Sequence, residues 1–230
     1  SSAGFVVTGE GVTTITYYAT DIAGNVQDAR TIVVRIDYTP SVTVATAPAE
    51  WMNAPVTVDL AATDNLSGVA SITYAATGAN PIAATTVAGG HTSFVVEGEG
   101  VTEIVYYATD VAGNVEAART IVVRTDYTVP ETTATAPETW QNTAVTVSLA
   151  ATDNLSGVAY VTYSATGAQT IDSTDVCADE TSFVIDAEGV TVVTFYSTDV
   201  AAASRSASTT RSPTSRSTET ARTRSTSRCS

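Results

Sequence analysis

Two short acidic segments are the residues of this chain best suited to chemistry. The sequence Thr-Asp-Asn-Leu-Ser-Gly stands at 63–68 and again at 152–157, and Thr-Asp-Val-Ala-Gly-Asn stands at 109–114. Calcium takes six to eight oxygen ligands, which carboxylates and amide carbonyls supply. The candidate calcium ligands in these segments are Asp64, Asp110 and Asp153.

The same segments also have a purely structural interpretation. An aspartate side chain can accept hydrogen bonds from backbone N–H groups that follow it, and glycine takes the positive φ that tight turns need. Gly68 and Gly113 stand where such turns require them. On this interpretation each aspartate caps its own turn and binds no metal, so the sequence alone leaves both interpretations open.

Trp51 and Trp140 are the second candidates for binding. They occupy equivalent places, each within an Ala-Pro-x-x-Trp-x-Asn segment. Exposed indole rings could stack on sugar rings, whereas buried rings would plug the open end of a core, which is the commoner use of large aromatic side chains. We expect burial, and we keep both tryptophans as candidate ligand-binding residues.

The chain shows no recognisable catalytic constellation. His91 is the single histidine, and the equivalent position 89 residues later holds Glu180. The carboxylates are plentiful, but none forms an acid–base pair beside a nucleophile. We expect a protein that is not an enzyme and that needs no cofactor other than calcium.

A repeated hairpin organises the chain. The stretch Tyr106–Asp126 alternates apolar residues, reverses at Ala-Gly-Asn and returns as a β-branched run, which is typical of a β-hairpin. Nearly the same letters stand 89 residues earlier, at Tyr17–Asp37, and the first part returns 89 residues later, at Phe195–Ala201. Self-similarity at a fixed period indicates a repeated domain, here of about 90 residues.

Alternation of apolar and polar residues predicts strands throughout this repeat. The run 56–62, for example, directs Val, Val, Leu and Ala to one face and Thr and Asp to the other. One apolar face per strand, with no helical period, predicts an all-β, antiparallel β-sandwich, although a small closed barrel would give a similar pattern. The expected strands before the hairpin are 42–45, 55–62, 69–75, 82–87 and 93–97.

The period also sets the expected domain boundaries. Residues 1–39 are the second half of a repeat, 40–129 a complete repeat, and 130–203 a repeat that lacks its last strand. Residues 204–230 form a tail rich in Ser, Thr and Arg, which cannot bury enough apolar surface to offset chain entropy, so we expect disorder. Because the tail begins where a Gly-Asn turn should stand, we interpret it as the product of a reading-frame change; the alternative is a genuine basic arm.

The charge is distributed unevenly. Residues 1–203 carry four arginines and 23 acidic residues, 204–230 carry six arginines and one glutamate, and the chain has no lysine. An acidic body repels phosphate backbones and anionic lipids, and the sequence has no apolar run long enough to span a bilayer. We therefore expect neither nucleic-acid binding nor membrane insertion.

The combined motifs resemble the bacterial immunoglobulin-like repeats of secreted and cell-surface proteins, and especially the leptospiral outer-membrane-protein-like type. The resemblance covers about residues 1–201. The residues that carry it are Val56–Ala70, Tyr106–Glu116 and the linkers Asp37–Pro40 and Asp126–Pro130.

The resemblance implies tandem immunoglobulin-like sandwiches in an extracellular or cell-surface protein. Such repeats serve as structural spacers or adhesive stalks, and their partners are neighbouring repeats, surface glycans or proteins. The alternative is a carbohydrate-binding or other accessory module of a secreted hydrolase. In this layout the two acidic loops lie at one end of the sandwich, where the incoming linker arrives with Asp37 or Asp126. These two aspartates complete the set of candidate calcium ligands, and a bound ion would stiffen the joint between repeats.

Overall fold

The computed structural model describes residues 4–202, so the tail that we predict to be disordered, 204–230, lies outside the described residues. The chain divides into two compact units. The first contains the described residues up to Ala47, Thr57–Val95 and Thr102–Val122; the second contains Pro48–Val56, Val96–Val101 and the described residues from Val123. The boundaries that the period suggests, 39/40 and 129/130, remain a prediction.

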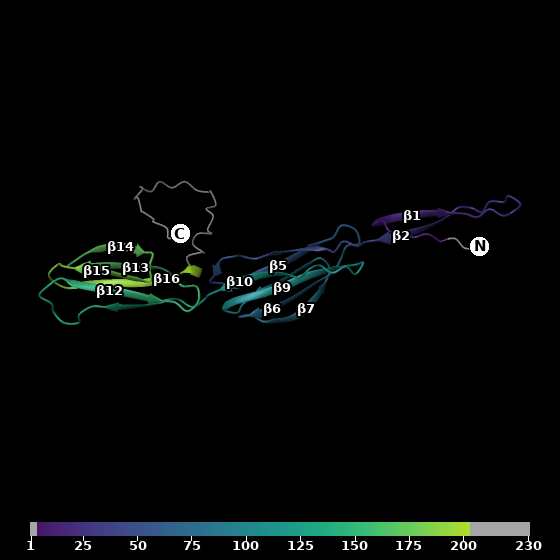
Figure 1. The fold of residues 1–230 in the computed structure, drawn as a ribbon. Coiled ribbons are helices and arrows are strands. Elements are labelled where there is room, and N and C mark those ends of the chain that lie inside the picture. Colours follow the sequence, from purple (N-terminus) through teal and green to yellow (C-terminus); the bar gives the residue numbers. More distant parts are fainter. Residues whose placement is uncertain (1–3, 203–230) are drawn as a thin grey trace, which may run out of the picture. The chain divides into compact units, whose positions relative to one another are not determined.

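The regular elements are β-strands, apart from one helical turn at 200–202, so the all-β prediction is confirmed. Figure 1 shows the strands in chain order. No helix in the described part is long and apolar enough to cross a bilayer. The strands up to residue 125 are β1 (Gly11–Tyr17), β2 (Arg30–Ile36), β3 (Val42–Thr46), β4 (Trp51–Met52), β5 (Val56–Thr63), β6 (Val69–Gly78), β7 (Ile82–Ala88), β8 (His91–Val96), β9 (Gly100–Asp110) and β10 (Arg119–Thr125).

The strands of residues 40–129 form the two sheets of an immunoglobulin-like sandwich. One sheet has the order β3-β5-β8 and the other β4-β10-β9-β6-β7. Neighbouring strands are antiparallel where β3 meets β5 and where β6 meets β7 and β9, whereas the short β4 runs parallel to β10. Both sheets are open at their edges, which decides for the sandwich over the closed barrel.

Alternation along the strands builds the core of this sandwich. Along β5 every second side chain is buried, and Leu60 is 0% exposed. Ile72 in β6 and Ile104 in β9 are also 0% exposed, so both sheets direct their apolar faces inward. The rings of Tyr74 and Phe94 stack across the two sheets with centroids 4.3 Å apart.

The strands that follow repeat the plan without a counterpart of β10. One sheet has the order β11-β12-β15 and the other β14-β13-β16. The same ring stack recurs between Tyr163 and Phe183, at 4.3 Å. These strands are β11 (Glu131–Thr135), β12 (Val145–Thr152), β13 (Val158–Gly167), β14 (Ile171–Val176), β15 (Glu180–Ile185) and β16 (Thr191–Asp199).

The first two strands form a separate two-stranded sheet (Figure 1). β1 and β2 pair antiparallel from Gly11 opposite Ile36 to Tyr17 opposite Arg30. This is the hairpin that the sequence predicts, and its sequence matches that of β9 and β10.

Candidate metal centre

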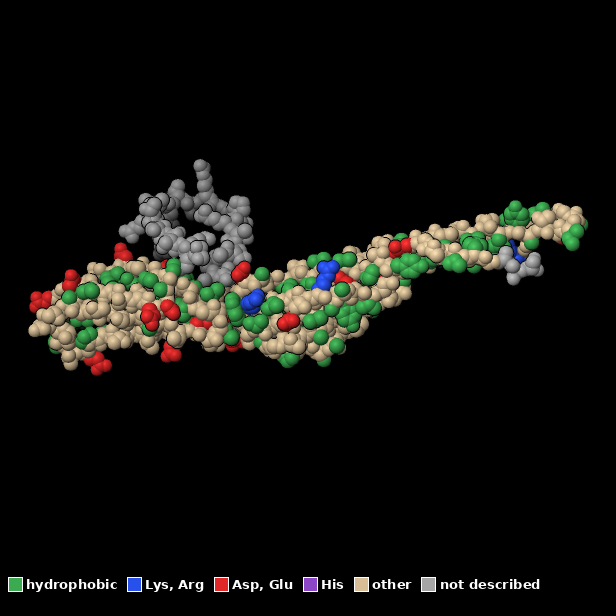
Figure 2. Space-filling model, viewed as in Figure 1, with side chains coloured by type: hydrophobic (Ala, Val, Ile, Leu, Met, Phe, Trp, Pro, Cys, Tyr) green, Lys and Arg blue, Asp and Glu red, His purple; other side chains and the backbone are tan. Residues whose placement is uncertain are grey.

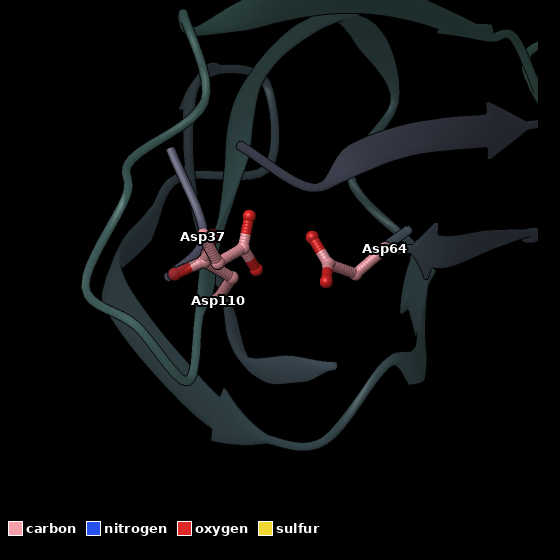
Figure 3. Close-up of side chains that lie close together, drawn as sticks. All are labelled: Asp37, Asp64 and Asp110. Atoms are coloured by element: carbon pink, nitrogen blue, oxygen red, sulfur yellow. The ribbon is translucent and has the colours of Figure 1, made fainter. Parts of the chain in front are cut away.

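Three predicted calcium ligands converge in the first unit. Asp37 follows β2, Asp64 follows β5, and Asp110 ends β9. Each offers a carboxylate oxygen, and these oxygens all lie within 4.8 Å of one another. In Figure 3 the Asp64 carboxylate points across a gap toward the other two. The layout therefore brings together side chains that lie 27 and 46 residues apart in sequence.

Local hydrogen bonds fix the orientation of these carboxylates. Asp64 Oδ2 accepts from the backbone N–H groups of Leu66 (3.0 Å) and Gly68 (2.8 Å), and Gly68 takes a φ of 90°. Asp110 accepts from the backbone and the side-chain amide of Asn114, both at 2.7 Å. The turn-capping bonds are thus present, but they leave lone pairs on the carboxylates, since each oxygen can accept about two bonds.

Asp37 ties the segment after β2 to the loop after β5. Its Oδ1 accepts from the N–H of Thr39 at 3.1 Å, and its Oδ2 accepts from the N–H of Ser67 at 2.9 Å. Hydrogen bonds from the Ser67 side chain and backbone lower the pKa of Asp37 against the opposing effect of desolvation. These hydrogen bonds favour the charged form of the carboxylate.

A second triad occupies the equivalent positions in the second unit. Asp126, Asp153 and Asp199 also offer oxygens within 4.8 Å of one another, and each lies 89 residues after its counterpart. We predicted Asp126 and Asp153 but not Asp199. The sequence did contain the signal, because Thr-Asp-Val-Ala at 198–201 repeats the letters at 109–112.

The hydrogen bonds of Asp126 and Asp153 reproduce those of Asp37 and Asp64. Asp126 Oδ2 accepts from the N–H of Ser156 at 2.8 Å, as Asp37 accepts from Ser67. Asp153 Oδ2 accepts from the N–H groups of Leu155 (3.0 Å) and Gly157 (2.7 Å). The third aspartate differs, because Asp199 accepts from the N–H of Ala202 where Asp110 accepts from Asn114.

One oxygen of the second triad also lacks the donor that its counterpart has in the first. Ser41 donates its hydroxyl to Asp64 Oδ1 at 3.4 Å, but the position equivalent to Ser41 holds Pro130, which has no donor. Asp153 Oδ1 is consequently a buried oxygen with no hydrogen-bond partner. A buried acceptor without a donor is costly, and a cation would satisfy it.

Burial and mutual repulsion act on the second triad. Asp126 is 0% and Asp199 is 3% exposed. Burial raises the pKa of Asp199, and the charges of Asp126 and Asp153 raise it further. Burial and like charge therefore both disfavour the charged form of Asp199.

The donor set favours calcium among the common metals. All six side chains are aspartates, which supply hard oxygen ligands, and the triads contain no cysteine or histidine. Zinc and copper sites use sulfur or imidazole nitrogen, whereas calcium takes carboxylates, carbonyls and water in flexible geometry. Three carboxylates fill part of such a shell and leave room for water.

The tryptophans depart from the expected burial. Trp51 is half-buried within β4, where it pairs with Arg124 of β10. Trp140 is 83% exposed and lies outside any strand, so the expectation of burial is wrong for this residue. The physical reason is that no described strand takes the place of β10 beside it.

Sequence reasoning also missed a buried structural carboxylate, Glu116. It is 8% exposed and accepts hydrogen bonds from the backbone N–H of Thr43 (3.0 Å), the Thr43 hydroxyl (2.6 Å) and the N–H of Ala108 (3.1 Å). Arg119 pairs with it at 2.8 Å. Because the equivalent residue in the preceding repeat is the exposed Gln27, the period alone did not mark this position as charged and buried.

Comparison with known proteins gives structural likenesses only. No family model matches the chain, and no curated protein matches it. A structure of fibronectin(III)-like modules of Clostridium thermocellum CbhA is similar over 70% of this chain and 88% of its own, with a TM-score of 0.35 and 17% identity. A Salmonella alpha-2-macroglobulin mutant is similar over 82% of this chain and 17% of its own, with a TM-score of 0.30 and 8% identity. The immunoglobulin-like arrangement is visible in the chain's own strand order, and the leptospiral repeat type stays a prediction.

Proposed function

We propose that this chain is a non-catalytic run of tandem β-sandwich repeats from an extracellular or cell-surface bacterial protein, in which calcium holds each connecting segment against the repeat that follows. The observation that carries the proposal is the recurrence of one aspartate triad at two sites. In each triad one aspartate comes from a connecting segment, one from a loop of the next repeat and one from the end of a strand of that repeat.

Electrostatics supports a cation at these triads. Two unit charges 4 Å apart repel by about 1 kcal/mol in water and by about 4 kcal/mol near a protein surface. The hydrogen bonds that the six carboxylates accept come from backbone N–H groups, the Ser41 and Ser67 hydroxyls and the Asn114 amide, which carry no full positive charge. A divalent ion would turn this repulsion into attraction.

The connecting segments support a spacer. Each segment ends in a proline, Pro40 or Pro130, and proline restricts bending because it fixes φ and lacks an N–H. The triad carboxylates are held by local hydrogen bonds, which suits a structural metal better than a reacting centre. A chain of this kind would set the distance and stiffness between whatever lies at its two ends.

Thermal unfolding in excess calcium and in EDTA tests the proposal. A ligand that binds only the folded state stabilises it by about 2.7 kcal/mol at 100 times its Kd, so the unfolding temperature should rise with calcium. The double variant Asp64→Asn/Asp153→Asn should lose this response. Asp59→Asn, an exposed aspartate on β5, should keep it. Equal unfolding temperatures in calcium and EDTA would rule out the calcium-held joint.

Carbohydrate binding is a second candidate, favoured by the exposure of Trp140. An indole ring that is 83% exposed can stack on a sugar face. Retention of the full chain on a glycan array, lost on Trp140→Ala and kept on Trp51→Ala, would support it. Absence of retention would leave the spacer function alone.

A further inference from the structure

The outer edge of β16 is open among the described residues. The sheet order β14-β13-β16 ends at β16, whereas the equivalent strand β9 pairs with β10 on that side. Both strands end in Thr-Asp, and the Gly-Val-Thr that opens β9 recurs at 189–191, where β16 begins. An unpaired edge presents N–H and C=O groups to which another strand can add.

The missing neighbour also leaves the core of the last repeat open. In β9 the inward side chains of Ile104 and Ala108 are 0% exposed, and Val123 of β10 is 1% exposed. In β16 the equivalent Val193 and Ser197 are only half-buried. A strand with β-branched residues on its inner face would bury Val193 and the surface around it.

The chain contains such a strand in β2. Its sequence, Arg-Thr-Ile-Val-Val-Arg-Ile, differs from that of β10 at the last residue alone. Ile32 of β2 is 53% exposed, and Val34, the counterpart of the buried Val123, is half-buried. Figure 2 shows apolar side chains gathered on the surface of this hairpin.

Charge favours the same pairing. Residues 130–202 carry ten acidic residues and no arginine or lysine, while β2 carries Arg30 and Arg35. Opposite charges accelerate the encounter of two surfaces and disfavour wrong partners.

We propose that β2 of a second molecule of this chain adds to the outer edge of β16 and takes the place that β10 holds in the complete repeat. The strand exchanges its partner β1 for β16, which has the same role in the repeat. The cost is small, because a two-stranded hairpin alone is at best marginally stable in water. The β1–β2 register, carried over by the period, places Val34 opposite Thr191 and Ile32 opposite Val193.

Each molecule then has one donor strand and one acceptor edge. Such a head-to-tail contact is heterologous, so association continues beyond dimers unless a ring closes. Calcium binding and strand addition use different residues, and the proposal therefore stands or falls independently of the metal.

Sedimentation of the full chain over a range from about 1 to 200 μM tests the proposal, with two variants that place the same charge on opposite faces of β2. The unaltered chain should associate with increasing concentration. Val34→Asp should weaken association at least tenfold, because it buries a charge in the acceptor core, which costs more than the 1.4 kcal/mol that corresponds to tenfold. Val33→Asp, on the outer face, should associate as the unaltered chain does.

Hydrogen exchange locates the contact. Amides of residues 191–195 should exchange more slowly as the concentration of the unaltered chain rises. In Val34→Asp the exchange rate of the same amides should not change with concentration. Each of three results would overturn the proposal: a strict monomer, equal association of both variants, or exchange in β16 that does not depend on concentration. The last result is also the one expected if residues 203–230 of the same molecule cover this edge.

Discussion

Residues 40–129 and residues 130–202 follow one plan, but only the first has the strand β10. With β10 present, the inward face of β9 is fully buried and Trp51 lies beside a strand. Without a described counterpart, the inward face of β16 is half-buried and Trp140 is 83% exposed. The comparison teaches that the last strand closes the core and packs beside the tryptophan, while the aspartate triad also forms in the repeat that lacks this strand.

The largest expected effect compares the same substitution in the two cores. Leu60 and Leu149 occupy equivalent positions and are 0% and 1% exposed. Leu60→Ala should cost about 4 kcal/mol in the free energy of unfolding, and Leu149→Ala about 3 kcal/mol, because an open core relaxes around the cavity more easily. Denaturant unfolding of both variants measures the difference, and a larger loss for Leu149→Ala would contradict the interpretation of an open core.

Glu116→Ala should have the next largest effect. It leaves the Thr43 hydroxyl, two buried N–H groups and the Arg119 guanidinium without their acceptor, at a cost of about 3 kcal/mol. Gln27→Ala, at the exposed equivalent position, is the matched control and should change the unfolding free energy by less than about 0.5 kcal/mol. A loss of unfolding free energy for Glu116→Ala as small as that for Gln27→Ala would mean that Glu116 acts only as a surface residue.

The strands were largely predictable, because period-two alternation and β-branched residues report burial on one face of a sheet. The predicted strands 42–45 and 82–87 appear as β3 and β7 with bounds shifted by one residue. The two-residue β4 was not predicted, because its parallel pairing with β10 is a long-range contact with no local pattern.

The metal centre was predictable in part. Asp37 and Asp64 converge because the sandwich places the incoming linker and the loop after β5 at the same end. The layout implied by the family resemblance predicted this arrangement. Asp199 was missed although the period marks it, because it lies next to the point where the repeat fails. The unpaired Asp153 Oδ1 could not be predicted, because it depends on the Ser41-to-Pro130 difference acting through a side-chain contact.

The Ser41-to-Pro130 difference gives a test with a smaller expected effect on a single oxygen. Pro130→Ser should supply the hydroxyl that Asp153 Oδ1 lacks and so weaken calcium binding at the second triad by about threefold, which corresponds to about 0.7 kcal/mol. Ser41→Ala is the reciprocal change and should strengthen binding at the first triad by a similar factor. Calorimetric titration of each variant measures the affinities, and shifts in the opposite directions would contradict the assigned role of this oxygen.

The smallest expected effect concerns Glu99. Its pKa is lowered from 4.5, chiefly by a hydrogen bond from the Thr128 side chain and then by the Tyr127 N–H. A lowered pKa in the folded state stabilises the fold above the unfolded value, and this contribution is lost as pH falls through the folded pKa. Glu99→Gln should therefore flatten the acid limb of the stability curve below about pH 4.5 and leave stability between pH 7 and 8 independent of pH. An unchanged acid limb would show that these bonds do not persist in solution.

Calcium stoichiometry tests the central claim most directly. Isothermal titration of the full chain should give two ions per molecule, and Asp64→Asn and Asp153→Asn should each reduce that number to one while Asp59→Asn leaves it at two. A chain that binds no calcium, or that keeps two ions in both triad variants, would contradict the assignment of the aspartate triads as the metal centres of the repeats.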